Sequence, residues 1–159
     1  GGTAADGIGP GTGVDAEGIA RKTAVVERAL ACHLDAPADA FETLRRVGGR
    51  EIAAIAGAVL RARRLGIPVV LDGFIGSAAV GPLAADNAAI AAHCIAGHVS
   101  AEPGHARLLA RLGLEPLLAL GMRLGEGSGA AVAVGVIRAA LAAHDQMATF
   151  AEAQVSGSL

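Results

Sequence analysis

The chain has 159 residues and a net charge of −2, and 53% of its residues are hydrophobic although only 2% are aromatic. This length suits one domain with a substantial core, and the alanine-rich apolar content favours closely packed helices over aromatic-rich sheets. The charge gives no electrostatic reason to expect a nucleic-acid partner, and the absence of Trp and Tyr removes the usual stacking platforms for single strands.

The sequence gives no sign of a membrane or secreted protein. Apolar runs are broken by Arg, His, Gly or Asp before they could span a bilayer, and no signal peptide opens the chain. The two cysteines, Cys32 and Cys94, are too few for a disulfide framework and fit a reducing compartment. We therefore expect a cytoplasmic protein.

The first residues are predicted to be a glycine-rich loop. Residues 1–13 contain six glycines and a proline, and Asp15 is a plausible N-cap for a helix over Ala16–Leu34. This helix carries Lys22, the only lysine of the chain. A glycine loop, a helix start and one cation are typical of a phosphate cradle, and an ordinary helix with a solvated lysine fits the segment equally well.

Acidic and glycine residues follow a short predicted strand. Val69–Leu71 is a compact apolar run of the buried parallel type, and it ends at Asp72 and Gly73. In open α/β sheets, ligands bind at the carboxyl ends of the strands. Asp72 could orient a ribose hydroxyl or cap the next helix.

The other predicted elements alternate between helices and one further strand. In chain order they are a helix over Pro37–Arg46 closed by Gly48-Gly49, a helix over Glu51–Leu65 with a basic last turn, a weakly helical region over Ser77–Ala92 interrupted at Gly81-Pro82, a strand over His93–Val99, a helix from the N-cap Ser100 to Leu112, an apolar run over Leu114–Leu120, a long helix to about Ala143, and a last helix over His144–Ala153 that packs on the core.

A glycine turn is the most informative segment. Residues 123–131 read Arg-Leu-Gly-Glu-Gly-Ser-Gly-Ala-Ala, and a helix-compatible run follows them. Glu126 is thus predicted at a helix N-terminus, where unpaired N–H groups and the dipole favour an ionised carboxylate. Such a carboxylate can act as a general base, and the alternative is that it only caps the helix.

Other readings of this turn and of the histidines are weaker. A dinucleotide fingerprint would place Glu126 against a pyrophosphate, and a nucleophile elbow would need glycine two residues before Ser128. His93, Cys94, His98 and His105 lack zinc-ligand spacing, so no metal site is predicted. A hydrolase built on Ser100 would lack an activating acid.

These segments predict an α/β fold, with an open parallel sheet, flanking helices in a Rossmann-like three-layer arrangement, and a helix-rich C-terminal part. The turns at Gly9–Gly13, Asp72-Gly73, Ser100 and Glu126 are expected to meet at one crevice of the sheet. Such a crevice is typical of a site for a nucleotide-like small molecule.

Several motifs in order resemble one family, the nicotinate-nucleotide–dimethylbenzimidazole phosphoribosyltransferases of cobalamin lower-ligand synthesis. They are Val-Gly-Gly-Arg-Glu-Ile-Ala at 47–53, Leu-Asp-Gly-Phe-Ile at 71–75, His-Val-Ser-Ala-Glu at 98–102, Leu-Gly-Leu-Glu-Pro at 112–116, Arg-Leu-Gly-Glu-Gly-Ser-Gly-Ala-Ala at 123–131 and Met-Ala-Thr-Phe at 147–150. The resemblance covers nearly all of the chain.

The resemblance implies that phosphoribose passes from nicotinate mononucleotide to a benzimidazole nitrogen, with no metal or other cofactor. Glu126 matches the family's catalytic base. The remaining positions that match substrate-binding residues are Lys22 and the Gly11 to Gly13 turn near the phosphate, Asp72, Gly73 and Ser100 beside the ribose phosphate, and Leu124, Gly125 and Gly127 around the base.

The resemblance also implies that the chain, 1–159 as a single α/β domain, is the C-terminal portion of an enzyme about twice as long. The missing N-terminal half would carry a Gly-Glu-Met-Gly-Ile-Gly-Asn-Thr-Thr-type phosphate loop and part of the benzimidazole pocket. Family enzymes are homodimers, so a homodimer is expected. A non-catalytic nucleotide-binding or subunit-association role is the alternative, and the sequence does not fix the acceptor azole.

Overall fold

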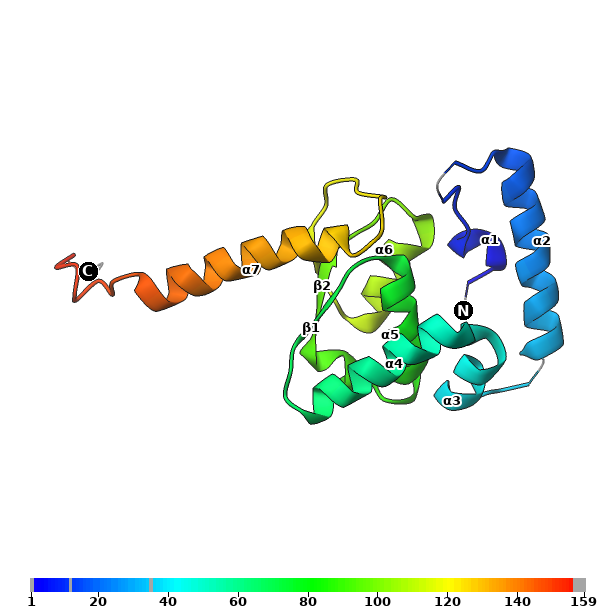
Figure 1. The fold of residues 1–159 in the computed structure, drawn as a ribbon, viewed down its shortest axis with the longest axis horizontal. Coiled ribbons are helices and arrows are strands. Elements are labelled where there is room, and N and C mark those ends of the chain that lie inside the picture. The colour runs from blue at the N-terminus through cyan, green and yellow to red at the C-terminus, as the bar shows by residue number, and fades with distance from the viewer. Residues whose placement is uncertain (1, 12, 35, 156–159) are drawn as a thin grey trace.

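The fold is built on a small parallel sheet at the centre of the molecule (Figure 1). The computed structural model describes residues 2–11, 13–34 and 36–155. Its strands are β1 (Val69–Leu71), β2 (Cys94–His98) and β3 (Pro116–Leu118), and neighbours pair in parallel in the order β1-β2-β3. The first two strands confirm the prediction, with β2 one residue shorter at each end. β3 was not predicted, because its Pro-Leu-Leu run lacks the β-branched residues typical of strands.

Helices cover both faces of this sheet, which confirms the expected open α/β architecture. The crossover helices α5 (Phe74–Asp86) and α6 (Pro103–Leu112) pack against each other, and α4 (Gly49–Arg64) packs on α5. Side chains from these helices and from β1 and β2 form one buried cluster that includes Val59, Leu71, Val80, Cys94 and Leu112. The N-terminal part of α7 (Ser128–Gln146) covers the other face.

The chain changes faces between β3 and α7. Two hydrogen bonds hold this connection beside the end of β2: the Val99 N–H donates to the Leu118 carbonyl (2.9 Å) and the Ala101 N–H donates to the Met122 carbonyl (3.3 Å). The glycine turn therefore passes the carboxyl ends of the strands. This path brings residue 126 to the same edge as residues 72 and 100.

The N-terminal segment contains α1 (Ala4–Gly7), α2 (Ala16–His33), α3 (Ala40–Thr43) and the π-helix η1 (Leu44–Gly48). The short α1 was expected to be loop. The start of α2 confirms the prediction, because the Asp15 carboxylate accepts the Gly18 N–H (2.8 Å).

The helix predicted from Pro37 begins three residues later. The Asp39 side chain accepts the Glu42 N–H (2.8 Å), and this N-cap defines the start of α3. Gly48 and Gly49 close the preceding helical segment as predicted, because Gly49 is the C-cap of η1. Gly49 is also the first residue of α4, and its φ of +69° permits the sharp change of direction between the two elements.

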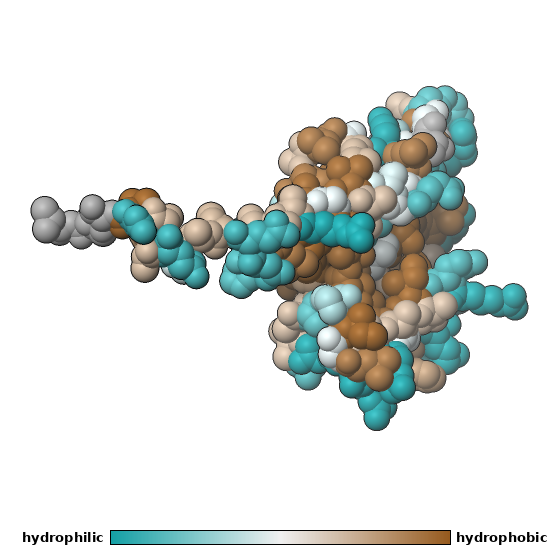
Figure 2. Space-filling model, turned by 60° about the vertical axis from the view of Figure 1, so that its left-hand side comes forward, coloured by the Kyte–Doolittle hydropathy of each residue, from teal (hydrophilic) through white to brown (hydrophobic). Residues whose placement is uncertain are grey.

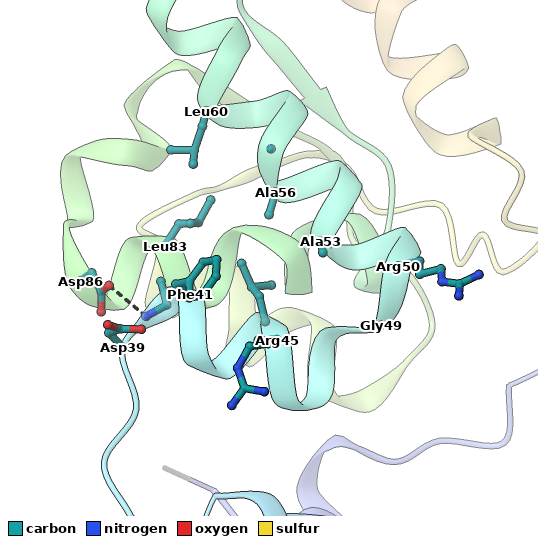
Figure 3. A pocket seen from close by; sticks show the side chains of 13 residues that line it. Asp39, Phe41, Arg45, Gly49, Arg50, Ala53, Ala56, Leu60, Leu83 and Asp86 are labelled. Carbon is teal, nitrogen blue, oxygen red and sulfur yellow. Dashed lines mark hydrogen bonds between the residues drawn. The ribbon is translucent and has the colours of Figure 1, made fainter.

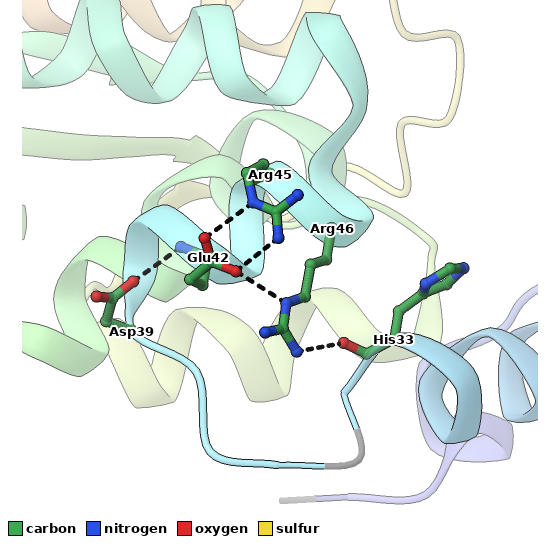
Figure 4. A network of polar contacts seen from close by, with 5 residues as sticks. All are labelled: His33, Asp39, Glu42, Arg45 and Arg46. Atoms are coloured by element: carbon green, nitrogen blue, oxygen red, sulfur yellow. Dashed lines mark hydrogen bonds and ion pairs between the residues drawn. The ribbon is translucent and has the colours of Figure 1, made fainter.

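A surface network joins the end of α2 to this region (Figure 4). Glu42 accepts hydrogen bonds from Arg45 and Arg46, which lower the pKa of its carboxyl to about 2. Arg46 also donates to the His33 carbonyl (3.0 Å). Because the carboxylate is solvent-exposed, the network orients these segments and contributes little to stability.

Three later predictions were wrong at their boundaries. The helix predicted from Ser77 with a break at Gly81-Pro82 begins at Phe74 and continues through Pro82. It ends at Asn87, whose side chain accepts the Ala89 N–H (3.0 Å) and starts the 3-10 helix η2 (Ala88–His93). Glu102, not Ser100, occupies the N-cap position of α6, and Pro103 provides its first residue.

The predicted last helix over His144–Ala153 is also absent. α7 continues to Gln146, and residues 147–155 are not helical, with turns over residues 150–154. There the N–H and hydroxyl of Thr149 both donate to the Glu152 carboxylate (2.8 and 2.9 Å). Met147 and Phe150 are 76% and 73% exposed, so this segment does not pack on the core.

Only the first turns of α7 are packed. Gly129 and Ala133 are buried, whereas Val132, Val136 and Leu141 are exposed, and the helix stands clear of the body (Figures 1 and 2). It does not combine the length with the apolar character that crossing a membrane requires, and neither does any other helix in the described part of the chain.

Gly129→Ala should destabilise the protein by about 1–3 kcal/mol, because the added methyl would overlap the buried ring of His98. Gly135→Ala is the matched control in the same helix, where a methyl meets nothing within 4 Å. That variant should gain about 0.5–1 kcal/mol from helix propensity. Urea unfolding measures both changes, and equal effects would contradict the assigned contact.

Candidate active site

A crevice of about 300 Å³ lies where the connections after the three strands meet. Five of the residues predicted from the sequence line it: Asp72, Gly73, Ser100, Gly125 and Glu126. They come from three separate connections, so the expected convergence at the carboxyl ends of parallel strands is confirmed for these three turns. The fourth predicted turn, Gly9–Gly13, does not line the crevice.

The crevice also contains residues that sequence reasoning did not assign to a site: Phe74, Ile75, Gly76, His98, Glu102, Met122 and Arg123. Most of them lie inside the motifs quoted above, so the signal was present in their proximity to predicted residues. Glu102 is the second glutamate of the crevice, and only the fold reveals that it faces the same space as Glu126.

The remaining predicted residues lie next to this crevice. A second cavity of about 640 Å³ is lined by Pro10, Gly13, Arg123 and Leu124, and it shares Arg123 with the crevice. The Arg123 guanidinium donates to the Gly11 carbonyl (2.7 Å), which joins the glycine loop to the turn that carries Glu126.

Lys22 lies beside the same glycine loop. A Cβ built on Gly11 would lie 3.5 Å from the Lys22 Nζ, so the only lysine points at the glycine loop. Gly127, by contrast, lines neither cavity. It is the N-cap of α7, with a φ of +75° that favours glycine.

Glu126 has an unusual backbone conformation. Its φ is +59°, in the left-handed region that costs a non-glycine residue about 1 kcal/mol or more. Its side chain is exposed at the crevice and makes no hydrogen bond or ion pair with the described residues. The carboxylate is therefore free to meet a ligand.

The helix-capping function belongs to a different carboxylate. Asp72 Oδ1 accepts the N–H of Ala130, in the first turn of α7, at 2.8 Å, although the two residues are 58 positions apart. Gly127 has no side chain with which to cap. Asp72 thus caps α7 and not the helix that follows it directly, and Glu126 is not needed for this purpose.

Asp72→Ala should lower the free energy of unfolding by about 1 kcal/mol, as expected for a lost cap. Asp72→Asn retains an oxygen acceptor for the Ala130 N–H and should lose much less. Chemical denaturation gives the stabilities, and amide exchange at Ala130 reports the hydrogen bond directly. Equal losses in the two variants would contradict the capping role.

Two buried histidines lie beneath the crevice. His98 is 4% exposed, its Nε2 is 3.9 Å from Asp72 Oδ1, and its Nδ1 is buried with no hydrogen-bond partner among the described residues. His105 is fully buried, and its ring lies 6.2 Å from that of His98. Within the described residues, no group of three or more His, Cys, Asp and Glu is arranged to hold a metal ion.

Acidification should destabilise the fold through His105. Burial, with repulsion from His98, lowers the pKa of His105 below its ordinary 6.5, and the opposing effect of Asp72 is smaller. The unfolded chain therefore binds this proton more tightly than the folded one. The stability that the neutral ring contributes is present above about pH 6.5 and lost as the pH falls.

Unfolding free energies between about pH 7.5 and 5.5 test this expectation, and His105→Asn is the comparison. Both chains retain His98 and Asp72, so these two groups affect both curves alike. The unfolding free energy of the wild type should therefore fall more steeply with falling pH than that of the variant. Parallel curves of unfolding free energy against pH would contradict the expected contribution of His105.

A larger cavity lies elsewhere (Figure 3). It measures about 750 Å³ and lies between α3, α4 and α5, with mostly apolar walls that include Phe41, Ala56, Leu60 and Leu83. Its one hydrogen bond among the residues drawn runs from the Ala40 N–H to Asp86 (2.9 Å). None of the predicted site residues lines it, so its size does not make it the candidate active site.

Polar side chains gather at the carboxyl ends of an open parallel sheet, which is where proteins of this α/β class bind their ligands. Comparison with known proteins specifies the class further. A family model described as "Phosphoribosyltransferase" matches residues 1–155, and the chain belongs to this family.

The relatives have consistent names. The chain is 72% identical over 159 residues to the nicotinate-nucleotide–dimethylbenzimidazole phosphoribosyltransferase of Novosphingobium aromaticivorans, covering 100% of this chain and 47% of the relative. It is 57% identical to the Sinorhizobium fredii enzyme of the same name, with 98% and 46% covered. The crystal structure of CobT from Thermus thermophilus superposes with a TM-score of 0.89 at 44% identity, over 98% of this chain and 46% of that one.

The chain thus spans about half the length of the curated relatives it matches. That this half is the C-terminal portion stays a prediction.

Proposed function

We propose that this chain is the base-bearing part of an enzyme that transfers phosphoribose from nicotinate mononucleotide to 5,6-dimethylbenzimidazole. The products are α-ribazole 5′-phosphate and nicotinate. The observation that carries the proposal is the uncommitted Glu126 carboxylate at the edge of the crevice, in a family whose relatives bear the name of this reaction.

Glu126 would act as the general base. The acceptor is an azole that must lose its N–H proton as its other nitrogen attacks the anomeric carbon. The C–N bond to nicotinate breaks with inversion, and the pyridinium leaves as neutral pyridine, so no covalent nucleophile is required. A carboxylate within hydrogen-bond reach of the azole N–H accelerates such a step by about 10²–10⁴.

The neighbouring cavity suits the phosphate of the nucleotide. Lys22 supplies a cation beside Gly11, and Arg123 holds the glycine loop against the base-bearing turn. In this proposal Gly11 and Gly13 allow close approach of the phosphate, and Asp72, Gly73 and Ser100 face the ribose. Leu124, which is 75% exposed, and Gly125 would contact the aromatic acceptor, with Gly127 setting the direction of the turn.

The enzyme would need the part of the family's chain that lies outside this sequence, and it would work as a cytoplasmic homodimer. More than half of each relative's length is unmatched by this chain. A chain that bound ligand and associated with that part without turnover would have the non-catalytic role.

Glu126→Gln should reduce formation of α-ribazole 5′-phosphate by at least about 10²-fold while nicotinate mononucleotide binding is largely retained. The exposed Glu27→Gln is the control for a lost carboxylate outside the crevice, and it should retain wild-type turnover. Chromatographic detection of product, with the rest of the family's chain supplied as a separate polypeptide, gives the measurement.

The second glutamate of the crevice sharpens the test. Glu102→Gln leaves Glu126 in place, so it should lose less turnover than Glu126→Gln at saturating azole. Full turnover in Glu126→Gln, or the larger loss in Glu102→Gln, would exclude Glu126 as the base.

A further inference from the structure

His105 lies beneath the crevice and does not line it. It is in the first turn of α6, is fully buried, and contacts two serines on different elements. Its Nε2 is 3.0 Å from the Ser77 hydroxyl on α5, and its Nδ1 is 3.0 Å from the Ser100 hydroxyl at the end of β2. The Ser100 backbone N–H also donates to Nδ1, at 2.9 Å.

These contacts determine the protonation of the ring. A backbone N–H can only donate, so His105 Nδ1 must be an acceptor and cannot carry a proton. The proton of the neutral ring is then on Nε2, where the Ser77 hydroxyl accepts it. The lowered pKa of His105 agrees with a ring that stays neutral.

The ring therefore connects two walls of the crevice. Ser100 belongs to the wall that follows β2, and Ser77 lies in the first turn of α5, which carries Gly73 and Phe74 at the other wall. The Phe74 ring packs on His105 with centroids 6.0 Å apart. Ser77 is itself fully buried, so this link is shielded from water.

We propose that His105 is a positioning residue that holds Ser100 at the crevice through its unprotonated Nδ1. The inference rests on the proposed function only for the identity of the ligand that Ser100 meets. Protonation of Nδ1 would expel the Ser100 N–H and release this wall. A histidine that served packing alone would need neither the tautomer nor the contact with Ser100.

Two variants separate the Ser100 contact from the Ser77 contact. His105→Asn places an amide oxygen near the Nδ1 position, where it can accept from Ser100, and removes the contact with Ser77. His105→Gln reaches toward Ser77 and leaves the Ser100 N–H without an acceptor. Both delete the ring, so a loss of packing affects them alike.

Amide exchange at Ser100 in this chain is the first readout. His105→Asn should retain protection within about threefold of the wild type, whereas His105→Gln should lose about tenfold, which corresponds to one hydrogen bond. Titration with nicotinate mononucleotide should show the same order, with affinity about tenfold weaker in His105→Gln. Equal loss in both variants, by either readout, would overturn the proposal.

Nitrogen NMR of the imidazole in the wild-type chain gives a test that needs no variant at position 105. The proton should be on Nε2 at neutral pH, and in Ser77→Ala the Ser100 amide should stay protected while the Nε2 signal changes. A proton on Nδ1 would overturn the proposal. If the wild type fails to bind nicotinate mononucleotide even with the rest of the family's chain supplied, the proposed function fails, and the tautomer and Ser100 exchange still decide the role of His105.

Discussion

The hydrogen bond from the Ala130 N–H to Asp72 joins two parts of the chain that would otherwise be independent. Asp72 directly follows β1, and Ala130 lies in the first turn of α7. Between these two elements the chain crosses from one face of the sheet to the other. The N-cap position of α7 is a glycine in the left-handed region, so no local side chain can cap this helix. A carboxylate from the sheet performs that task, and the orientation of the whole glycine turn follows from it.

Because Asp72 caps α7, the carboxylate of Glu126 in the same crevice stays available for a ligand. Asp72 is committed to the helix, whereas Glu126, four residues before Ala130, has no partner among the described residues. Beneath the crevice lie two buried histidines, His98 and His105, where apolar side chains would be usual. Gly129 admits the His98 ring against α7, and His105 links Ser77 of α5 to Ser100, which follows β2. Polar contacts, rather than bulk packing, therefore set the positions of the crevice walls.

Sequence reasoning located the elements better than their ends. Val69–Leu71 and the long helix that follows the glycine turn were predictable from apolar patterning and glycine punctuation, and the crevice from the acid and glycine after β1. β3 was missed because Pro-Leu-Leu carries no strand signal, and Ser100 was assigned to a helix cap because its contact with His105 depends on tertiary packing. The link from Asp72 to α7 spans 58 residues and has no local signature, so only the fold reveals it.

The left-handed backbone of Glu126 also bears on how this position can change. Glycine would relieve the unfavourable φ, so replacing Glu126 by glycine should make the folded chain more stable while deleting the carboxylate. Selection for stability alone would thus remove the glutamate. Stabilised variants obtained without an activity screen are therefore expected to accumulate changes at this position.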